Sequence, residues 1–339
     1  MKKLDYLWRR LEGTEAEKQF LQNRFNEMSV KEQYIIEGAI QIIGINNAMD
    51  LINLTEQLIR FDFYYKAADE KSLGEYVAKY KEDASDEILP YIKTEKLGRE
   101  YHEDFQGAFT NEGYIIQRNA IKQIYDGTNL DKMTGGDWAI KLKVSSKSNP
   151  EGVWINLSDY EFSTLEPYEI AIALDVLGID DWKEANLLDA KCIFPNIIEL
   201  KDQYDNLEKL IIDGNNLGYV CDEGDQGRDF FMEHLESAME LEGCTKLDFA
   251  IDISQNLNCY DFIPRSVNFE KYGRLMAERD RIVKLDSILG DNFDYIKYAK
   301  ADIKKKELKP CKYGFIKRNE EKFYYEFSKE PDSIKLSME

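Results

Sequence analysis

The pattern of apolar positions along the chain alternates between helical and extended periods and divides the sequence into short modules. In the first third, apolar residues at helical spacing predict three helical segments, and a period of two predicts a short strand. A fourth helical segment and a Gly-rich, aromatic hairpin follow this strand. In chain order, the predicted elements are helices over 4–26, 30–43 and 50–57, a strand at 61–64, a helix over 69–81 and a hairpin over 107–118.

A Gly-rich connector over 120–137 separates this part from a second pattern. Alternating strands at 138–144 and 153–157 flank a turn and predict a hairpin. A helix over 166–177, stopped by Gly178, and a third strand at 187–193 complete this module. The residues after Asn319 are polar, and we expect this tail to be loosely held.

The chain also repeats itself. With an offset of 199 residues, 37–78 overlies 236–277 with nine identities, among them the pairs Asp62/Asp261, Phe63/Phe262 and Gly74/Gly273. Two further stretches recur later, Tyr91-Ile92-Lys93 as Tyr295-Ile296-Lys297 and Gly113–Asn119 as Gly314–Asn319. This period is too long for a solenoid and indicates a duplicated domain.

Together, these patterns predict an α+β fold: an elongated, multi-domain chain of small helical and β-hairpin/helix modules, duplicated with an offset of about 199 residues. The expected domains are a partial unit at 1–119, the connector at 120–137, an N-terminal α+β domain at 138–206, an acidic helical middle domain at 207–258, a C-terminal α+β domain at 259–319 and a polar tail at 320–339.

The charge of the chain is concentrated in one segment. The formal net charge is −20, and residues 151–270 hold 27 acidic against 7 basic residues, whereas the rest of the chain is balanced. Such a segment repels nucleic acid and attracts proteins that carry basic clefts. Duplex DNA carries one charge per about 1.7 Å of axis, so twenty carboxylates match roughly one helical turn of DNA.

Carboxylates in this segment are spaced for display. In a helix, Asp229, Glu233, Glu236 and Glu240 lie on one face, an arrangement of like charges that folding alone does not favour, although a plain solvated helix face is the competing interpretation. The candidate partner-binding carboxylates are Asp180, Asp181, Glu184, Asp202, Asp205, Asp213, Asp222, Glu223, Asp225, Asp229, Glu233, Glu236, Glu240 and Glu242.

Catalytic and metal-binding patterns are absent from the sequence. No phosphate-binding Gly-rich loop, His-Glu-x-x-His or Gly-x-Ser-x-Gly occurs, and Asp222-Glu223-Gly224-Asp225 lacks the ligand spacing of a calcium loop. The five cysteines form no Cys-x-x-Cys pair, and no apolar run has the length of a signal peptide or membrane span. We therefore expect a cytoplasmic binding protein that is not an enzyme and has no cofactor and no metal.

The order of several motifs resembles the ArdA antirestriction proteins of Gram-positive bacteria and their mobile elements. The resemblance rests on Asp50–Leu58 followed by Phe61-Asp62-Phe63-Tyr64, on the second copy at Ile253–Pro264, and on Gly152–Leu157. The family motif residues are Gly98, Arg99 and Glu100 in the first copy and Phe293, Asp294 and Tyr295 in the second. The first copy lacks an N-terminal domain of its own, and Lys304-Lys305-Lys306 is basic where a mimic would be acidic.

This resemblance implies a protein whose surface carboxylates imitate DNA phosphates and occupy the DNA groove of a type I restriction-modification enzyme. It would protect phage or mobile-element DNA in a bacterial host, as a homodimer or as a monomeric pseudo-dimer of its two copies. The expected partner is a nuclease or methyltransferase complex with a basic DNA-binding cleft, with neither nucleic acid nor membrane bound directly. The alternatives are an inhibitor of another nucleic-acid-binding defence system, such as a CRISPR effector, and a generic acidic interaction module.

Overall fold

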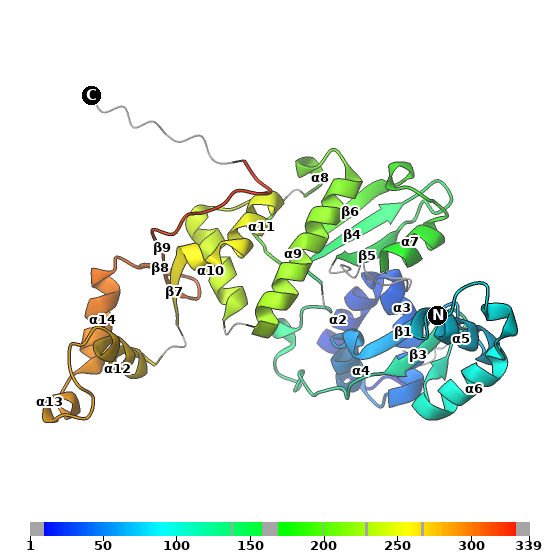
Figure 1. Ribbon diagram of the computed structural model, residues 1–339, viewed down its shortest axis with the longest axis horizontal. Helices are drawn as coiled ribbons and strands as arrows, with labels where there is room; N and C mark the ends of the chain where they lie inside the picture. The colour runs from blue at the N-terminus through cyan, green and yellow to red at the C-terminus, as the bar shows by residue number, and fades with distance from the viewer. Residues whose placement is uncertain are drawn as a thin grey trace. The chain divides into compact units, whose positions relative to one another are not determined.

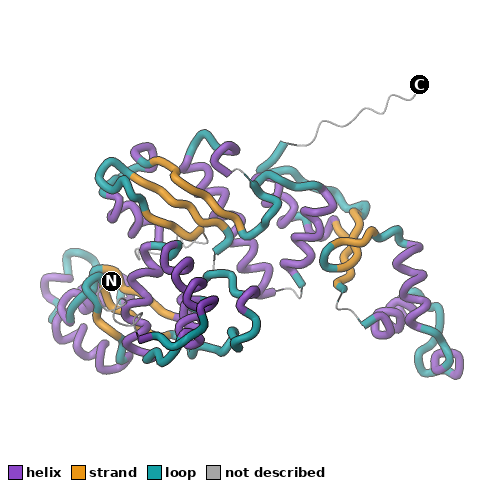
Figure 2. The backbone as a smooth tube through the Cα atoms, turned by 180° about the vertical axis from the view of Figure 1, so that it is seen from behind, coloured by secondary structure: helices purple, strands orange, loops and turns teal. Residues whose placement is uncertain are grey.

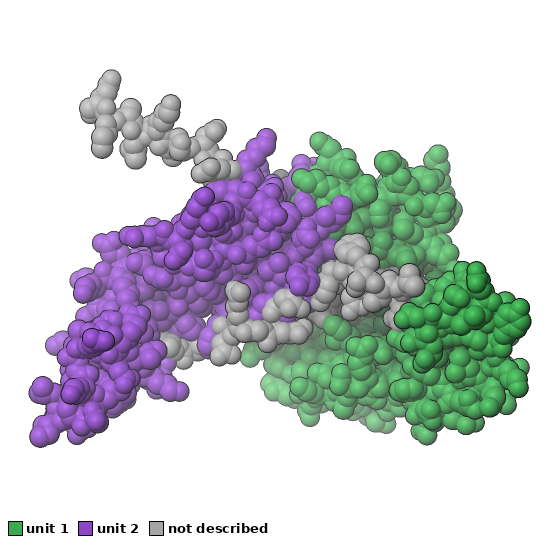
Figure 3. All heavy atoms as spheres, in the orientation of Figure 1, with its two compact units in different colours: residues 1–193, 204–211 green, residues 194–203, 212–339 purple. Residues whose placement is uncertain are grey.

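The computed structural model describes residues 10–136, 138–157, 169–198, 200–227, 230–265 and 268–329 (Figure 1). The chain divides into two compact units, which are coloured separately in Figure 3. Unit 1 comprises residues 1–193 and 204–211, and unit 2 comprises 194–203 and 212–339. The described residues form helices and three small antiparallel sheets, which confirms the predicted α+β class (Figure 2).

Unit 1 begins with helices that surround a three-stranded sheet in the order β1-β3-β2. Its elements are α2 (Glu15–Asn26), α3 (Val30–Ile43), α4 (Ala48–Thr55), η1 (Leu58–Arg60), β1 (Phe61–Tyr65), α5 (Glu70–Tyr76), the π-turn η2 (Val77–Lys81), η3 (Leu89–Tyr91), α6 (Thr94–Phe105), β2 (Ala108–Phe109) and β3 (Gly113–Gln117).

Two capping boxes determine where the first helices start. The Thr14 hydroxyl accepts a hydrogen bond from the Glu17 N–H, and the Glu17 carboxylate accepts one from the Thr14 N–H. Ser29 and Glu32 do the same for α3. Each box satisfies two backbone donors that a helix start leaves open. The continuous helix expected over 4–26 is therefore wrong across 11–14, and residues 4–9 lie outside the described part.

The rest of unit 1 contains a second sheet in the order β5-β4-β6, with both strand pairs antiparallel. Ile140, Leu142 and Val144 are fully buried at alternate positions of β4, and Lys141 and Ser145 on the opposite face are buried as well, so this central strand is covered on both faces. The predicted hairpin and third strand are confirmed. The elements are η4 (Leu130–Lys132), β4 (Ile140–Ser145), β5 (Val153–Leu157), α7 (Glu169–Leu177), η5 (Trp182–Glu184) and β6 (Asn186–Cys192).

Unit 2 holds a third sheet in the order β7-β9-β8. Helix α9 crosses the boundary between the two units, because residues 207–211 belong to unit 1. The elements of this part of the chain are α8 (Leu200–Gln203), α9 (Leu207–Gly227), α10 (Phe231–Glu242), α11 (Leu247–Gln255), η6 (Leu257–Cys259), β7 (Tyr260–Pro264), α12 (Phe269–Arg279), α13 (Ile288–Asp291), α14 (Tyr295–Lys305), β8 (Lys309–Cys311) and β9 (Gly314–Arg318).

The order of elements from α3 to β3 recurs from α10 to β9, and we call these segments, each with the residues that follow its last strand, the first repeat (30–126) and the second repeat (230–329). The strand register recurs as well, because Phe63 pairs with Ile115 and Phe262 pairs with Ile316. The duplication itself stays a prediction, with which this order of elements and this strand register agree. The Tyr-Ile-Lys match is not structurally equivalent, since Tyr91 ends η3 whereas Tyr295 begins α14.

The segment after the last strand is attached in the same way in both repeats. In the first, the Gln57 side chain bonds the backbone N–H and carbonyl of Lys122. In the second, the Asn256 side chain bonds the N–H and carbonyl of Tyr324. Phe323 is buried beside Tyr260, where their rings meet edge to face. The expectation of a loose tail is therefore wrong for residues 320–329, because side chains of α11 hold this segment.

Candidate partner-binding surface

Helix α10 carries four of the candidate carboxylates, and three of them contact the β-sheet of unit 2. The Glu236 carboxylate lies 3.1 Å from Lys312 Nζ and accepts a hydrogen bond from the Tyr313 hydroxyl at 2.9 Å. The Glu240 carboxylate accepts one from the Lys312 N–H at 3.0 Å. These contacts attach α10 to the β8–β9 turn, and they line a cavity of 260 Å³ together with Phe194 and Met239.

Glu242, at the end of α10, is engaged by β7 and β9. Its carboxylate lies 3.0 Å from the Arg318 guanidinium and accepts a hydrogen bond from the Tyr260 hydroxyl at 2.9 Å. Burial and the neighbouring Glu242 carboxylate raise the pKa of Tyr260, so its hydroxyl stays a donor. The side chains of Glu236 and Glu242 are only 26% and 20% exposed. The expectation that these two carboxylates are openly displayed is therefore wrong, because they pair with basic side chains of their own unit.

The other candidates of this region differ in exposure. Asp213 is only 4% exposed, because its position in α9 faces the interior, so its expected display is also wrong. Asp202 is exposed, whereas Asp222 and Glu233 are partly buried. Three candidates cannot be placed: the side chains of Glu223 and Asp225 and the whole of Asp229 lie outside the described residues.

Unit 1 presents a set of exposed carboxylates that we call the acidic rim. Its members lie in the loop around η5, on β6 and at the start of α9, and they are Asp180, Asp181, Glu184, Asp189, Asp205 and Glu208. Lys183 lies near acids from two of these places. The Asp181 carboxylate raises the pKa of Lys183 most, and the Glu208 carboxylate raises it further. The rim therefore combines acids that lie 20 or more residues apart in sequence.

Two rim members, Asp189 and Glu208, were not among the predicted candidates. Asp189 lies on β6, where it is exposed, and Glu208 lies in the first turn of α9, where the helix dipole favours an acid. The acidic excess of the segment included both residues, and Glu208 lies close enough to Lys183 to raise its pKa, as Asp181 does.

The family motif residues of the first repeat lie where helices α5 and α6 cross. Gly98 of α6 lies so close to α5 that a Cβ at this position would be 1.7 Å from the Glu70 carbonyl oxygen. Arg99 Nε lies 2.9 Å from the Glu70 carboxylate, and Glu100 pairs with Lys96 one turn earlier. These contacts position α6 against α5.

In the second repeat, the motif residues organise the start of α14. The Asp294 carboxylate accepts a hydrogen bond from the Lys297 N–H and caps the helix. Tyr295 is buried, donates its hydroxyl hydrogen to the Gly290 carbonyl and contacts the Phe293 ring at 5.0 Å. In the described structure, these residues contribute to folding, with Asp294 alone exposed as an acid.

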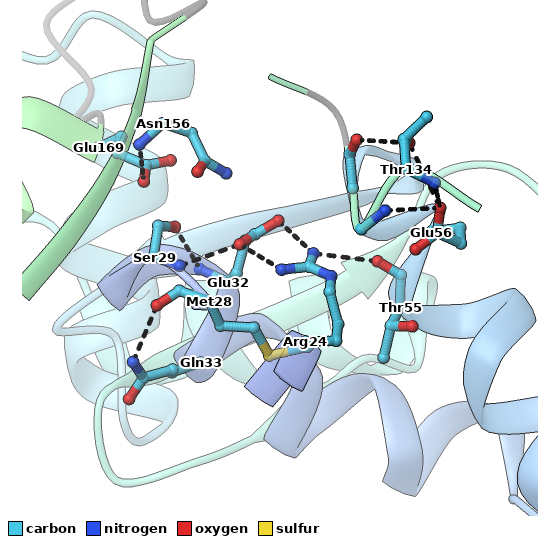
Figure 4. A network of polar contacts seen from close by, with 12 residues as sticks. Arg24, Met28, Ser29, Glu32, Gln33, Thr55, Glu56, Thr134, Asn156 and Glu169 are labelled. Atoms are coloured by element: carbon cyan, nitrogen blue, oxygen red, sulfur yellow. Dashed lines mark hydrogen bonds and ion pairs between the residues drawn. The ribbon is translucent and has the colours of Figure 1, made fainter. Parts of the chain in front are cut away.

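A buried charge cluster in unit 1 was not predicted (Figure 4). The Arg24 guanidinium forms two hydrogen bonds with the Glu32 carboxylate and a third, of 3.1 Å, with the Thr55 carbonyl. Lys141 of β4 is only 1% exposed, and burial lowers its pKa to about 8 against the opposing effect of Glu32. Sequence alone did not single out these residues, because each one resembles an ordinary surface charge.

Two further features are absent from the described residues, a metal-binding cluster and a membrane-spanning helix. These residues contain no group of three or more His, Cys, Asp and Glu side chains that could hold a metal ion. None of their helices combines the length and apolar character needed to cross a bilayer. Comparisons with protein-family models, curated proteins and solved structures found no match for this chain.

Proposed function

We propose that this chain is an acidic inhibitor that occupies the DNA-binding groove of a type I restriction-modification enzyme in the cytoplasm of a bacterial host. It acts by binding, without catalysis, cofactor or metal, and protects phage or mobile-element DNA. The observation that carries the proposal is the acidic rim, in which six exposed carboxylates belong to a segment of 27 acidic and 7 basic residues.

The rim supports binding to a basic groove better than α10 does. A DNA-binding cleft is lined by Lys and Arg that contact phosphates, so it attracts exposed carboxylates. Glu236 and Glu242 already neutralise Lys312 and Arg318. The Asp180 and Glu184 carboxylates are exposed in the loop around η5. The proposed contact surface is therefore the rim.

The test is the plating of unmodified phage on cells that carry a type I restriction system, with and without the protein. The protein should restore plating. The rim variant D180N/E184Q/D189N/E208Q should restore it less, because each exposed contact contributes on the order of 0.2–1 kcal/mol, so that the loss of four weakens binding about fourfold or more.

The matched control is E82Q/D83N/D86N/E87Q, which removes the same four charges from an exposed loop of unit 1 outside the acidic segment. This variant should protect phage as the unchanged protein does. Equal losses in both variants would attribute the effect to total charge. No restoration by the unchanged, soluble protein would refute a type I target, and the same plating assay with a CRISPR effector would test the alternative.

A further inference from the structure

The two repeats end in lobes of the same architecture and opposite charge. We define the acidic lobe as residues 69–118, from α5 to the end of β3, and the basic lobe as residues 268–318, from α12 to the end of β9. The acidic lobe has 12 acidic and 7 basic residues, and the basic lobe has 8 acidic and 14 basic residues. The net charges are therefore −5 and +6 in a chain of −20.

Three exposed lysines of the basic lobe lie on one side of α14. Lys297, Lys300 and Lys304 lie at helical spacing and are all exposed. Asp302, the acid within α14, is buried and bound by Lys306 and the Tyr272 hydroxyl. The packed helix α12 adds Glu270 and Asp280, which are paired with Arg274 and Arg279 respectively. The exposed acids nearest to these lysines along the chain are Asp294, which caps α14 before Lys297, and Glu307, which follows Lys304.

The basic lobe also carries exposed apolar side chains. Ile288 and Leu289 of α13 are 83% and 74% exposed, and Leu275, Ile282 and Ile296 are also exposed. Several large, exposed apolar side chains in one lobe are typical of a protein-binding surface. Phosphates of a nucleic acid would use the lysines and leave the apolar side chains uncovered, so the combination favours an acidic protein partner.

The acidic lobe offers the complementary surface. On α6, Glu100, Glu103 and Asp104 are exposed near the helix end. Tyr91 is 86% exposed, and Ile88 and Phe105 are exposed as well. Like the basic lobe, it combines exposed apolar residues with an excess of one sign of charge. Every molecule carries both lobes, so the two are always present at the same concentration.

We propose that the basic lobe of one molecule binds the acidic lobe of a second copy of this chain. Opposite charges select the pairing and the exposed apolar residues form its centre, whereas two acidic or two basic lobes repel each other. Each molecule carries one lobe of each kind, so the contact joins different surfaces and extends or closes according to its geometry. This inference is independent of the proposed target.

The first test is the weight-average mass of the full chain by light scattering at rising concentration. In low salt, the mass should rise above 39.6 kDa. It should return to that value in about 1 M NaCl, where the Debye length falls to about 3 Å. A mass of 39.6 kDa at about 100 μM protein in low salt overturns the proposal.

Charge reversal makes the test specific. K297E/K300E/K304E brings the net charge of the basic lobe from +6 to 0, and E100K/E103K/D104K brings that of the acidic lobe from −5 to +1. Each variant should therefore lower self-association at least tenfold, since the attraction between opposite charges is lost. A mixture of the two variants should associate again, because the first keeps an unaltered acidic lobe and the second keeps an unaltered basic lobe, and these two can pair. The matched control K122E/K132E/K147E reverses three exposed lysines outside the lobes and should associate as the unchanged chain does.

Other occupants of the basic lobe give distinct results. If K297E/K300E/K304E abolishes binding of a fluorescent DNA duplex or of anionic vesicles while the mass remains 39.6 kDa throughout, the lysines serve a polyanion and the proposal is wrong. A mixture that fails to associate, although both variants are folded by circular dichroism, also overturns it. A monomer whose hydrodynamic radius changes on charge reversal would indicate pairing within one chain instead.

Discussion

Asp252 of the second repeat occupies the position that Asn53 has in the first, and both side chains hold the segment that follows the last strand of their repeat. Asn53 Oδ1 accepts hydrogen bonds from the N–H groups of Ile124 and Tyr125 at 2.7 and 2.8 Å. Asp252 Oδ1 accepts them from Glu326 and Phe327 at 2.9 and 3.0 Å. One buried acceptor per repeat thus attaches a segment more than 70 residues away.

Replacement of this acceptor should destabilise the protein. Asp252→Ala removes the partner of three backbone N–H groups and of the Ser328 hydroxyl, so we expect a loss of about 2–4 kcal/mol in the free energy of unfolding. Urea denaturation measures it. Asp248→Ala, in the same helix, should cost about 1 kcal/mol or less.

The cost should depend on the attached segment. In a chain that ends at Asn319, Asp252 has lost these partners, and the same substitution should then change stability by a few tenths of a kcal/mol at most. An equal loss in the full and shortened chains would show that Asp252 acts through other contacts.

Local patterns predicted the hairpin well, because a period of two and a flanking turn suffice for β4 and β5. Long-range contacts were harder. The polar composition of 320–329 indicated a loose tail, and nothing nearby reveals that Asp252 binds it. For the same reason, the acidic pattern could not separate the buried Asp213 from the exposed Asp202. The Ser/Thr-x-x-Glu patterns that begin at Thr14 and Ser29 are visible in the sequence, and the first of them would have placed the start of the first helix correctly.

Gly74 and Gly98 should not tolerate a methyl group. A Cβ at Gly74 would lie 1.7 Å from the Thr94 carbonyl oxygen, and a Cβ at Gly98 equally close to that of Glu70. Gly→Ala in an unobstructed helix adds about 1 kcal/mol of stability, whereas forcing α5 and α6 apart should cost about 2 kcal/mol or more. Thermal unfolding of G74A and G98A decides between these effects. A raised melting temperature would mean that the two helices do not cross at this distance.

The Arg24–Glu32 pair should show a strong coupling. Arg24→Met leaves a buried carboxylate without its main partner, and Glu32→Leu leaves a buried guanidinium without its partner, so each should cost about 3–5 kcal/mol in the free energy of unfolding. The double variant R24M/E32L replaces both charges with apolar groups and should recover most of this loss. Urea denaturation of the four proteins gives the coupling energy. Additive losses would contradict a direct contribution of the pair.

Lys141 should make stability depend on alkaline pH. Its pKa is about 8 in the folded protein, because burial disfavours the charged ammonium, and about 10.4 in an unfolded chain. Between these values the unfolded state binds a proton that the folded state has released, so this residue makes the free energy of unfolding rise with pH. The penalty for burying the charge is fully present below pH 8 and amounts to roughly 3 kcal/mol.

Other groups titrate in the same range, so the measurement has to be a difference. Burial raises the pKa of Cys244 to about 12, which makes stability fall with pH as the unfolded thiol ionises. Lys141→Met removes the lysine alone. The variant should be more stable than the unchanged protein at pH 7, and this advantage should shrink as the pH rises towards 10. Urea denaturation at several pH values tests it, and an advantage that stays constant from pH 7 to pH 10 would show that Lys141 keeps an ordinary pKa in the folded protein.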